Sequence, residues 1–219
     1  MAVLLIVGAG PRLGEAVALR FGRDGYDVGL VARNQKHLAA VAGLLKDAGV
    51  TVGWAVADMA DAAALTAAIA RLADGAGGVD VLLHNASAWR PARTLETTAD
   101  QLLADLAVGA ASLLTAARAV APAMRAAGGG TILATGSGAA DAATPDVASL
   151  GAQKAALRAL VRALAADLRG DGIHCATVTV RGLISDGRLS PARIADVYAE
   201  LVAETAGPRE TWRTVVDLS

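Results

Sequence analysis

Apolar and polar positions along the chain fall into two alternating patterns. Seven segments are continuous or nearly continuous apolar runs, which are typical of strands buried on both faces of a parallel sheet. Between them, apolar residues recur at the 3.6-residue spacing of a helix. The predicted strands cover residues 2–8, 26–32, 50–58, 79–87, 130–137, 173–180 and 212–218, and the predicted helices cover 13–24, 35–48, 61–74, 99–127, 147–169 and 191–204.

This alternation predicts βαβ units and therefore a Rossmann-type α/β fold, a doubly wound parallel sheet of about seven strands with helices on both faces. Polar joints between the segments are short, and we find no linker, repeat or block of charge that would mark a domain boundary. We therefore expect residues 1–219 to form a single domain.

Composition excludes several classes of protein. The formal net charge of the 219 residues is -1 and the basic residues are scattered, so the chain lacks the charge pattern of a nucleic-acid binder. Cys175 is the only cysteine. A disulfide framework and a cysteine-based metal site are thereby excluded, we expect no metal, and a reducing cytoplasm fits best.

Neither of two apolar segments is expected to enter a membrane. Residues 1–10 lack a basic region and run directly into a glycine-rich loop, so we interpret them as a first strand and not as a signal peptide. Residues 102–124 are interrupted by Asp105 and Arg118, and fall short of an apolar span of about 20 residues. We expect no membrane partner.

The first joint between a strand and a helix carries the first chemistry. Gly8, Gly10 and Gly14 lie directly between these two elements. The free N–H groups of a helix N-terminus favour an anion there, and the pyrophosphate of a dinucleotide is the natural ligand. The alternative is that these glycines only make a tight turn.

The end of the second predicted strand bears on the choice of dinucleotide. Ala32 and Arg33 stand where an NAD-binding Rossmann unit would place an acid for the ribose 2′-hydroxyl. Arg33 could instead bind a 2′-phosphate, since a guanidinium group contacts phosphate through two hydrogen bonds. We therefore expect NADP(H) in preference to NAD(H). A solvated surface arginine is the alternative.

Several ordered motifs resemble those of the short-chain dehydrogenase/reductase family along essentially the whole chain. "VGAGPRLG" resembles the T-G-x-x-x-G-x-G loop, "VAD" ending at Asp58 resembles the acidic position that meets adenine, and "HNAS" resembles N-N-A-G. "TILATGSG" resembles the strand that ends in the catalytic serine, and "LGAQK" lies where the family has Y-x-x-x-K. The cofactor-binding positions that this resemblance implies are Gly8, Gly10, Arg12, Leu13, Gly14, Arg33, Asp58, Asn85, Ala86 and Lys154.

The resemblance also implies four catalytic positions, of which two have changed. Ser137 and Lys154 match the serine that binds the substrate oxygen and the lysine that holds the ribose and lowers the tyrosine pKa. Leu150 stands at the position of the tyrosine that moves the proton. Gly109 stands at the position of the asparagine that anchors a proton-relay water.

Other departures affect the nicotinamide side of the implied site. Arg12 replaces the middle glycine of the loop, and its long side chain either pairs with the pyrophosphate or fills its place. Arg181 replaces a proline after the sixth strand, and Asp186 replaces a threonine. His84 is a speculative substitute acid, and the alternative is a partly buried histidine hydrogen-bonded to a loop.

Two hypotheses for the function remain open at this stage. The first is an NADP(H)-dependent oxidoreductase acting on a small carbonyl or alcohol through a modified proton path. The second is a non-catalytic protein that senses a dinucleotide or serves as a partner subunit. Leu150 and Gly109 count against standard chemistry, whereas the retained glycines and Lys154 favour contact with a cofactor.

Two alanine-rich helices suggest self-assembly. The segments 99–127 and 147–169 carry more apolar surface than contact with one sheet requires. The residues that suggest this are Leu113, Ala116, Ala155, Ala159, Leu160 and Ala163. Since the family commonly dimerises through these two helices, the resemblance implies a homodimer or homotetramer.

Overall fold

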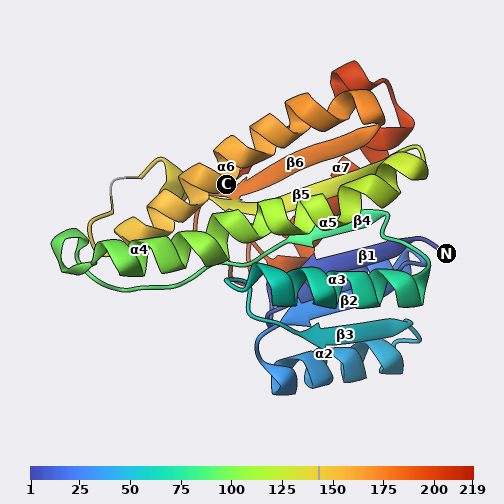
Figure 1. The fold of residues 1–219 in the computed structure, drawn as a ribbon, viewed down its shortest axis with the longest axis horizontal. Coiled ribbons are helices and arrows are strands. Elements are labelled where there is room, and N and C mark those ends of the chain that lie inside the picture. Colours follow the sequence, from blue (N-terminus) through green and yellow to red (C-terminus); the bar gives the residue numbers. More distant parts are fainter. Residues whose placement is uncertain (143) are drawn as a thin grey trace.

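Seven parallel strands form one sheet, with the order β3-β2-β1-β4-β5-β6-β7, in a computed structural model that describes residues 1–142 and 144–219 (Figure 1). The strands are β1 (Val3–Val7), β2 (Asp27–Ala32), β3 (Val52–Val56), β4 (Val81–His84), β5 (Gly130–Ser137), β6 (Ile173–Val180) and β7 (Val215–Leu218). The helices are α1 (Leu13–Arg23), α2 (Gln35–Asp47), α3 (Ala62–Ala76), α4 (Ala99–Leu106), α5 (Ser112–Ala126), α6 (Ala148–Leu168) and α7 (Pro191–Ala203). This arrangement confirms the predicted fold class.

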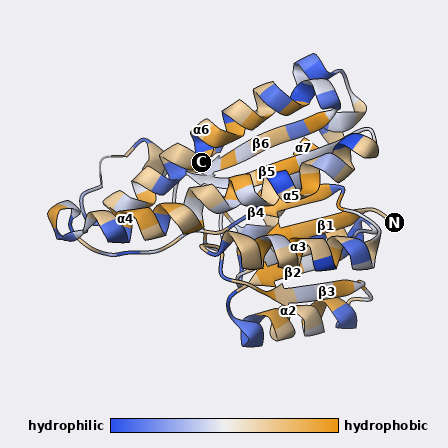
Figure 2. Ribbon diagram, viewed as in Figure 1, coloured by the Kyte–Doolittle hydropathy of each residue, from blue (hydrophilic) through white to orange (hydrophobic). Residues whose placement is uncertain are grey.

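Two hydrophobic cores lie on the two faces of the sheet. The helices α3, α5 and α6 bury residues such as Ile69, Leu113 and Leu157 against one face, while α1, α2 and α7 cover the other with residues such as Phe21 and Tyr198. The central strands β1 and β4 are buried at every position, and all of these residues except His84 are hydrophobic (Figure 2). The edge strands β3 and β7 are only partly buried, so the expectation of burial on both faces is wrong for these two. An edge strand has a neighbour on one side only.

The order of the strands reverses between β1 and β4. Chain connections run outward from β1 to β2 and β3 on one side, and from β4 to β7 on the other. After the carboxyl edge of the sheet, the connection that follows β1 and the connection that follows β4 therefore lead to helices on opposite faces. Open α/β sheets bind ligands in the crevice that such a divergence creates.

The helix predicted over residues 99–127 is interrupted. A π-helical turn at Ala107–Ala111 separates α4 from α5. A π turn inserts one extra residue into a helix and occurs frequently at functional sites. The turn contains Gly109, the position implied for the asparagine.

Among the described residues, the helical stretch Ala99–Ala126 is long and apolar enough, by length and composition alone, to cross a membrane. The expectation that this segment falls short of such a span is therefore wrong. Half of its apolar window is buried inside the molecule, where it contacts α3 and α6. The stretch is accordingly a core helix of this fold.

An arm projects beyond the carboxyl edge of the sheet, at the left of Figure 1. We define the arm as residues 88–106, 138–142 and 144–150, which include α4 and the first turn of α6. Its segments are joined directly, since the Ala92 N–H donates to the Asp146 carbonyl at 3.1 Å. The Thr94 hydroxyl donates to the Pro145 carbonyl, also at 3.1 Å.

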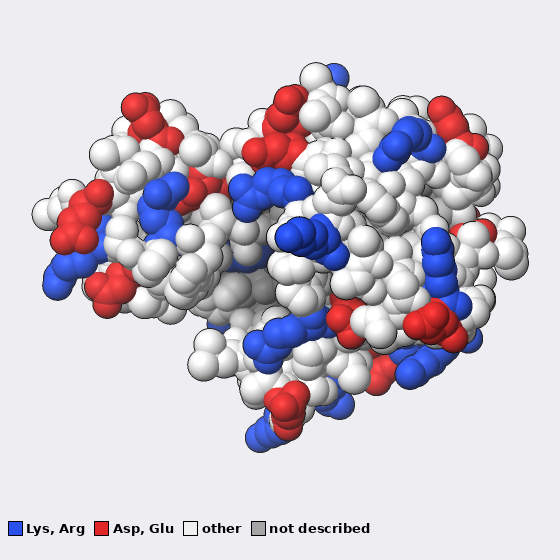
Figure 3. Space-filling model, turned by 90° about the horizontal axis from the view of Figure 1, so that it is seen from below, with Lys and Arg blue, Asp and Glu red and all other residues white. Residues whose placement is uncertain are grey.

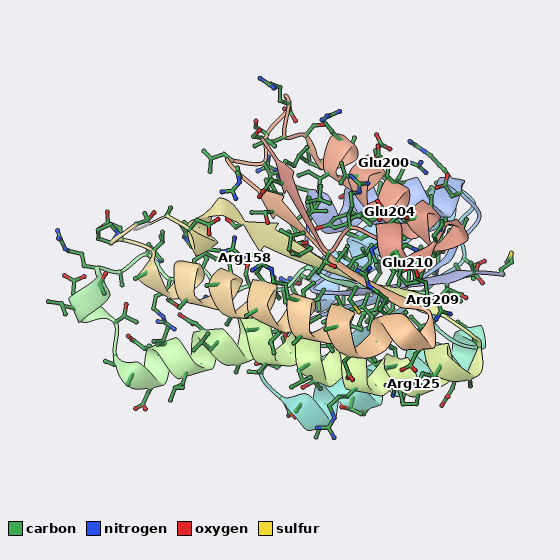
Figure 4. The ribbon with its side chains drawn as sticks, turned by 90° about the horizontal axis from the view of Figure 1, so that it is seen from above. Arg125, Arg158, Glu200, Glu204, Arg209 and Glu210 are labelled. Carbon is green, nitrogen blue, oxygen red and sulfur yellow. The ribbon has the colours of Figure 1, made fainter. Side chains whose placement is uncertain are left out.

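Arginine side chains hold the C-terminal segment at the end of the molecule opposite the arm, where Figure 4 shows Glu204 and Arg209. Arg209 donates to the Gly170 carbonyl at 2.6 Å. Arg169 donates to the carbonyl oxygens of Arg209, at 2.7 Å, and Trp212, at 3.1 Å. These bonds fix the chain that leads into β7.

Candidate active site and dinucleotide pocket

The loop after β1 approaches the loop after β4 so closely that only glycine fits. Gly8 has a φ of 89°, and a Cβ added there would lie 2.5 Å from the Ala86 nitrogen. The N–H groups of Gly8 and Ala9 both donate to the Val31 carbonyl, at 2.9 and 3.0 Å. The space beside Gly10 is open, with nothing within 4 Å of a Cβ. The loop therefore leaves room for a ligand that lies against its backbone.

A cavity of about 260 Å³ opens at this edge of the sheet. Its walls come from the loops after β1, β2, β3 and β4 and from the π turn. The lining residues are Gly8, Ala9, Gly10, Ala32, Arg33, Asn34, His37, Met59, Asn85, Ala86, Ser87 and Val108. The space-filling view shows a hollow between the arm and the main body, with basic side chains along its border (Figure 3).

The end of β2 presents cationic and hydrogen-bonding groups to this cavity. Arg33 is exposed and also lines a neighbouring surface recess together with Lys36. Asn34 caps α2 by accepting from the His37 N–H at 3.1 Å. His37, which the sequence analysis did not single out, also lines the cavity. The signal that could have identified it is its place in the first turn of α2.

The remaining implied cofactor positions contribute differently. Leu13 and Gly14 are buried at the start of α1, and Leu13 packs into the core. Asp58 is exposed at the end of β3, where one carboxylate oxygen accepts from the Ala60 N–H at 3.0 Å. Its neighbour Met59, and not Asp58, lines the cavity.

Arg12 has a backbone conformation that side chains rarely adopt. Its φ is 70° and its ψ is -92°, at the N-cap of α1. The guanidinium donates to the Ile184 carbonyl at 2.5 Å, across 172 positions of sequence. The Arg12 side chain therefore reaches the loop between β6 and α7.

Lys154 is almost completely buried, with 5% of its surface exposed. Its ammonium donates to the Thr135 carbonyl at 2.8 Å, two residues before Ser137 on β5. Burial lowers the pKa of this lysine to about 8, because removal from water disfavours the charged form.

A hydrogen-bonded chain connects the neighbourhood of Lys154 to the glycine loop. The Thr135 hydroxyl donates to Asn85 Oδ1 at 2.8 Å, and the Asn85 amide donates to the Gly8 carbonyl at 3.1 Å. Tyr198 on α7 lies 2.8 Å from the same hydroxyl. Since that hydroxyl donates to Asn85, Tyr198 is the donor to Thr135. Tyr198 thus has a polar role within the core.

Ser137 and the start of α6 lie next to each other. Ser137 Oγ accepts from the Ala139 N–H at 3.2 Å and so begins a short turn. A Cβ at Gly151 would lie 2.9 Å from the Ala139 carbonyl, so α6 packs directly on this turn. Leu150 is half-buried in the same first turn of α6. The structure therefore brings the positions implied for serine, tyrosine and lysine to one end of β5 and α6.

Gln153 fills the space beside Gly109. A Cβ at Gly109 would lie 2.1 Å from Gln153 Oε1. The buried Gln153 amide accepts from the Ala88 N–H at 2.9 Å and donates to the Ala88 carbonyl at 3.1 Å. The side-chain amide of Gln153, on α6, therefore lies beside the position implied for the asparagine. Its two hydrogen bonds to Ala88 hold the loop after β4. Sequence reasoning missed Gln153, whose only signal is its place beside Lys154.

His84 does not fit the role of a substitute acid. Its side chain is fully buried, with Nε2 at 2.7 Å from Ser112 Oγ. Because Ser112 donates its proton to the Val108 carbonyl at 2.7 Å, Nε2 must be the protonated nitrogen. Burial and the nearby Lys154 ammonium lower the pKa of His84 to about 3. The ring is therefore neutral near pH 7.

Two sets of ionic groups stabilise the arm: the first joins its own segments, and the second attaches it to the body. Arg90 donates to both carboxylate oxygens of the buried Asp105, at 2.7 and 2.9 Å. Ser149, beside Leu150, donates to the same carboxylate at 2.6 Å. The bonds from Arg90 and Ser149 hold the pKa of Asp105 below its usual value, against the opposing effect of burial.

The second fastening involves the residue that replaces the family's proline. Arg181 pairs with Asp141 at 3.2 Å and with Asp217 at 2.8 Å. Arg158 on α6, labelled in Figure 4, also binds Asp141. The two guanidinium groups lower the pKa of Asp141 to about 2. Asp186, in contrast, is exposed on the loop between β6 and α7.

Within residues 1–142 and 144–219, no three His, Cys, Asp or Glu side chains gather where they could hold a metal ion. The buried thiol of Cys175 lies inside β6, and burial raises its pKa to about 12.

The chain is similar to known dehydrogenases in sequence and in structure. The family model for short chain dehydrogenases matches residues 2–187. The subunit BbsC of (2S)-[(R)-hydroxy(phenyl)methyl]succinyl-CoA dehydrogenase from Thauera aromatica is 33% identical over 190 residues, covering 87% of this chain and 75% of that protein. A 3beta-hydroxysteroid dehydrogenase from Mediterraneibacter gnavus is 28% identical over 212 residues, covering 95% and 76%.

A solved structure provides the corresponding comparison in three dimensions. A metagenomic short-chain oxidoreductase, solved in complex with NADP, superposes with a TM-score of 0.87 at 28% identity. The alignment covers 100% of this chain and 97% of that one. The similarity therefore extends over the cavity, the β5–α6 region and the C-terminal strand.

Proposed function

The chain belongs to the short-chain dehydrogenase/reductase family, and from that membership we propose that it binds NADP(H) and slowly reduces or oxidises a small carbonyl or alcohol. Members of this family are oxidoreductases that bind nicotinamide dinucleotides. The observation that carries the proposal is the hydrogen-bonded chain from Lys154 through Thr135 and Asn85 to Gly8. It joins the retained lysine to the retained glycine loop.

The preference for NADP(H) rests on charge at the end of β2. Arg33 is exposed beside the cavity, with Lys36 on the same recess, and no acid stands at positions 32 and 33 to repel a phosphate. A bidentate guanidinium–phosphate contact is strong and specific. The relative solved with NADP is consistent with this choice.

The residues present fit a dinucleotide on the adenine side. The space beside Gly10 is the kind of opening that a pyrophosphate requires, and Asn85 and Ala86 line the same cavity. When bound, the nicotinamide supplies or accepts the hydride. Ser137 would donate a hydrogen bond to the substrate oxygen, and Lys154 would supply the proton through a water molecule, because its pKa is near 8.

Leu150 sets the expected rate. A leucine has no proton to transfer, and loss of a general acid typically lowers a rate by about 10²- to 10⁴-fold. We therefore propose slow turnover and not its complete absence. The alternative of a non-catalytic sensor or partner subunit is not favoured, since the relatives named above are dehydrogenases or oxidoreductases.

Titration of the protein with NADPH and with NADH, followed by fluorescence and by thermal shift, tests cofactor binding. We expect tighter binding of NADPH, and we expect Arg33→Ala to remove most of that preference. If neither dinucleotide binds, the oxidoreductase proposal fails. If NADH binds more tightly, the role given to Arg33 is wrong.

A reconstruction of the proton path tests the chemistry. The Leu150→Tyr change should raise turnover on a panel of simple ketones by roughly 10²-fold or more, the scale of a general acid. Adding Gly109→Asn requires Gln153→Ala as well, because the new side chain would otherwise overlap Gln153 Oε1. If neither variant exceeds the wild-type rate, the proposed site is not a catalytic frame.

A further inference from the structure

Arg12 joins two loops on either side of the cleft. It stands at the start of α1, and its guanidinium donates to the Ile184 carbonyl in the loop between β6 and α7. Ile184 is half-buried and packs against the core beneath that loop. The contact therefore holds residues 181–190 over the end of the glycine loop.

The backbone of Arg12 supports a specific role for this contact. Among the described residues, Arg12 is the one non-glycine with a positive φ. Its ψ of -92° also lies outside the left-handed helical region that asparagine and other side chains sometimes adopt. Such conformations persist where the surrounding structure enforces them, and they cluster at functional sites.

The cavity at the carboxyl edge of the sheet covers one half of the implied dinucleotide site. The cavity is lined by Gly8, Gly10, Arg33 and their neighbours, which belong to the adenine side. Its lining includes no residue of the 181–190 loop and none of the three positions at the end of β5 and the start of α6. The Lys154 ammonium is directed onto the Thr135 carbonyl. The cavity therefore opens on the adenine side, and the Arg12–Ile184 contact lies outside its lining, between the glycine loop and the loop 181–190.

We propose that the Arg12–Ile184 contact is a latch that closes the nicotinamide side, so that adenine nucleotides bearing a 2′-phosphate but no nicotinamide bind this chain about as tightly as NADPH. This inference rests on the proposed function, because it uses the same adenine-side cavity. The latch must open before the nicotinamide enters. The apparent affinity for the whole dinucleotide equals the affinity of the open form multiplied by the fraction of molecules in which the latch is open.

Isothermal titration with adenosine 2′,5′-bisphosphate and with NADPH tests the proposal on the wild-type chain and on Arg12→Gly. For the wild type we expect dissociation constants within about threefold of each other. In Arg12→Gly we expect NADPH to bind about tenfold tighter or more, since a hydrogen bond from a charged donor is lost from the closed state. Binding of the bisphosphate should be unchanged.

Two matched variants and a second readout separate the latch from other effects. Arg12→Ala keeps the Cβ and its unfavourable φ but has no donor, and it should behave like Arg12→Gly. Arg33→Ala should weaken both ligands. Backbone amides of residues 182–189 should exchange hydrogen faster in Arg12→Gly than in the wild type, in the absence of any ligand.

The outcomes distinguish the two proposals. A wild-type chain that binds NADPH at least about tenfold tighter than the bisphosphate, or an Arg12→Gly variant that binds NADPH more weakly, would overturn the latch and show that Arg12 supports the cofactor. Unchanged hydrogen exchange in the 182–189 loop would also overturn it. Binding of neither ligand to either protein would instead remove the proposed function.

Discussion

At the scale of single residues, Lys154 shows how a side chain can be retained while its partner is lost. In the family, a tyrosine one helical turn away would share its environment. Here Leu150 stands there, and the ammonium is buried with the Thr135 carbonyl as its acceptor. Removal from water disfavours the charged form of the Lys154 ammonium, whose acceptor is a neutral carbonyl. This burial lowers the pKa of Lys154.

This burial predicts a dependence of stability on pH. The pKa of Lys154 is about 8 in the folded chain, below its ordinary value of 10.5, so between these values the unfolded chain binds more protons. The free energy of unfolding should therefore rise with pH in this window, by up to about 3 kcal/mol. Denaturant unfolding of the wild type and Lys154→Met at pH 7, 8, 9 and 10 measures it.

The quantity to follow is the difference in the free energy of unfolding between the wild type and Lys154→Met. The buried thiol of Cys175 has a raised pKa, and its titration acts in the opposite direction in both proteins. The gap between the wild type and Lys154→Met should shift in favour of the wild type above pH 8. A constant gap from pH 7 to 10 would contradict the burial of the ammonium.

A second residue-scale prediction concerns Gly109 and Gln153. Gly109→Asn should destabilise the fold by about 1–3 kcal/mol, since overpacking forces the Gln153 amide from its place. Gln153→Ala should cost a similar amount, about 1–3 kcal/mol, by leaving the Ala88 groups without a partner. The double variant should be less destabilised than the sum, and a double-mutant cycle in urea measures the coupling. Strict additivity would contradict the proposed overlap.

At the scale of elements, the arm is held in place by charges that are far apart in the sequence. Asp141 lies in the turn after β5, Arg158 on α6, and Arg181 directly after β6. Their ion pairs join the turn after β5 to α6 and to the end of β6. They hold the Ser137 turn against the helix that carries Leu150 and Lys154.

The ionic cluster predicts loss of stability in acid. The pKa of Asp141 is about 2 in the folded chain, below its ordinary value of 3.8, so its contribution is present above pH 4 and is lost as the pH falls toward 2. Asp141→Asn should therefore lower the melting temperature at pH 7. The difference from the wild type should shrink between pH 4 and pH 2 in thermal scans. Equal melting temperatures at pH 7 would exclude a stabilising role.

At the scale of the whole molecule, the two alanine-rich helices have an inner and an outer face. The structure places Leu113 and Ala116 in the core of the chain itself, so the expectation that they suggest an interface is wrong for these two. Ala155, Ala159 and Ala163 are exposed on α6. Leu114 of α5 is also exposed, at 40% of its surface.

The exposed alanines on the outer face of α6 are the basis for predicting self-assembly. We expect a homodimer or homotetramer in sedimentation velocity at micromolar concentration, and we expect Ala159→Glu to shift it toward monomer by placing a charge on the apolar face. Exposed Ala40 on α2, which covers the opposite face of the sheet, offers a matched control, and Ala40→Glu should leave the assembly unchanged. A wild-type chain that is a monodisperse monomer would contradict the prediction.

Local patterns in the sequence were enough to predict the sheet and its helices, because apolar periodicity reports burial directly. The seven strands and the βαβ order were readable in this way, as were the glycine positions at the end of β1. The motif spacing also placed Ser137, Leu150 and Lys154 at one end of β5 and α6. Each of these features depends on residues close together in the chain.

Contacts between distant residues were decided only by the tertiary structure. The amide of Gln153 beside Gly109, the neutral and buried His84, and the contact of Arg12 with Ile184 each join segments that no periodicity relates. Their physical basis is the packing of side chains from different elements into one volume. The sequence by itself therefore determined the frame of the fold and the places of its motifs, whereas the tertiary structure decided which side chains from distant segments share one volume.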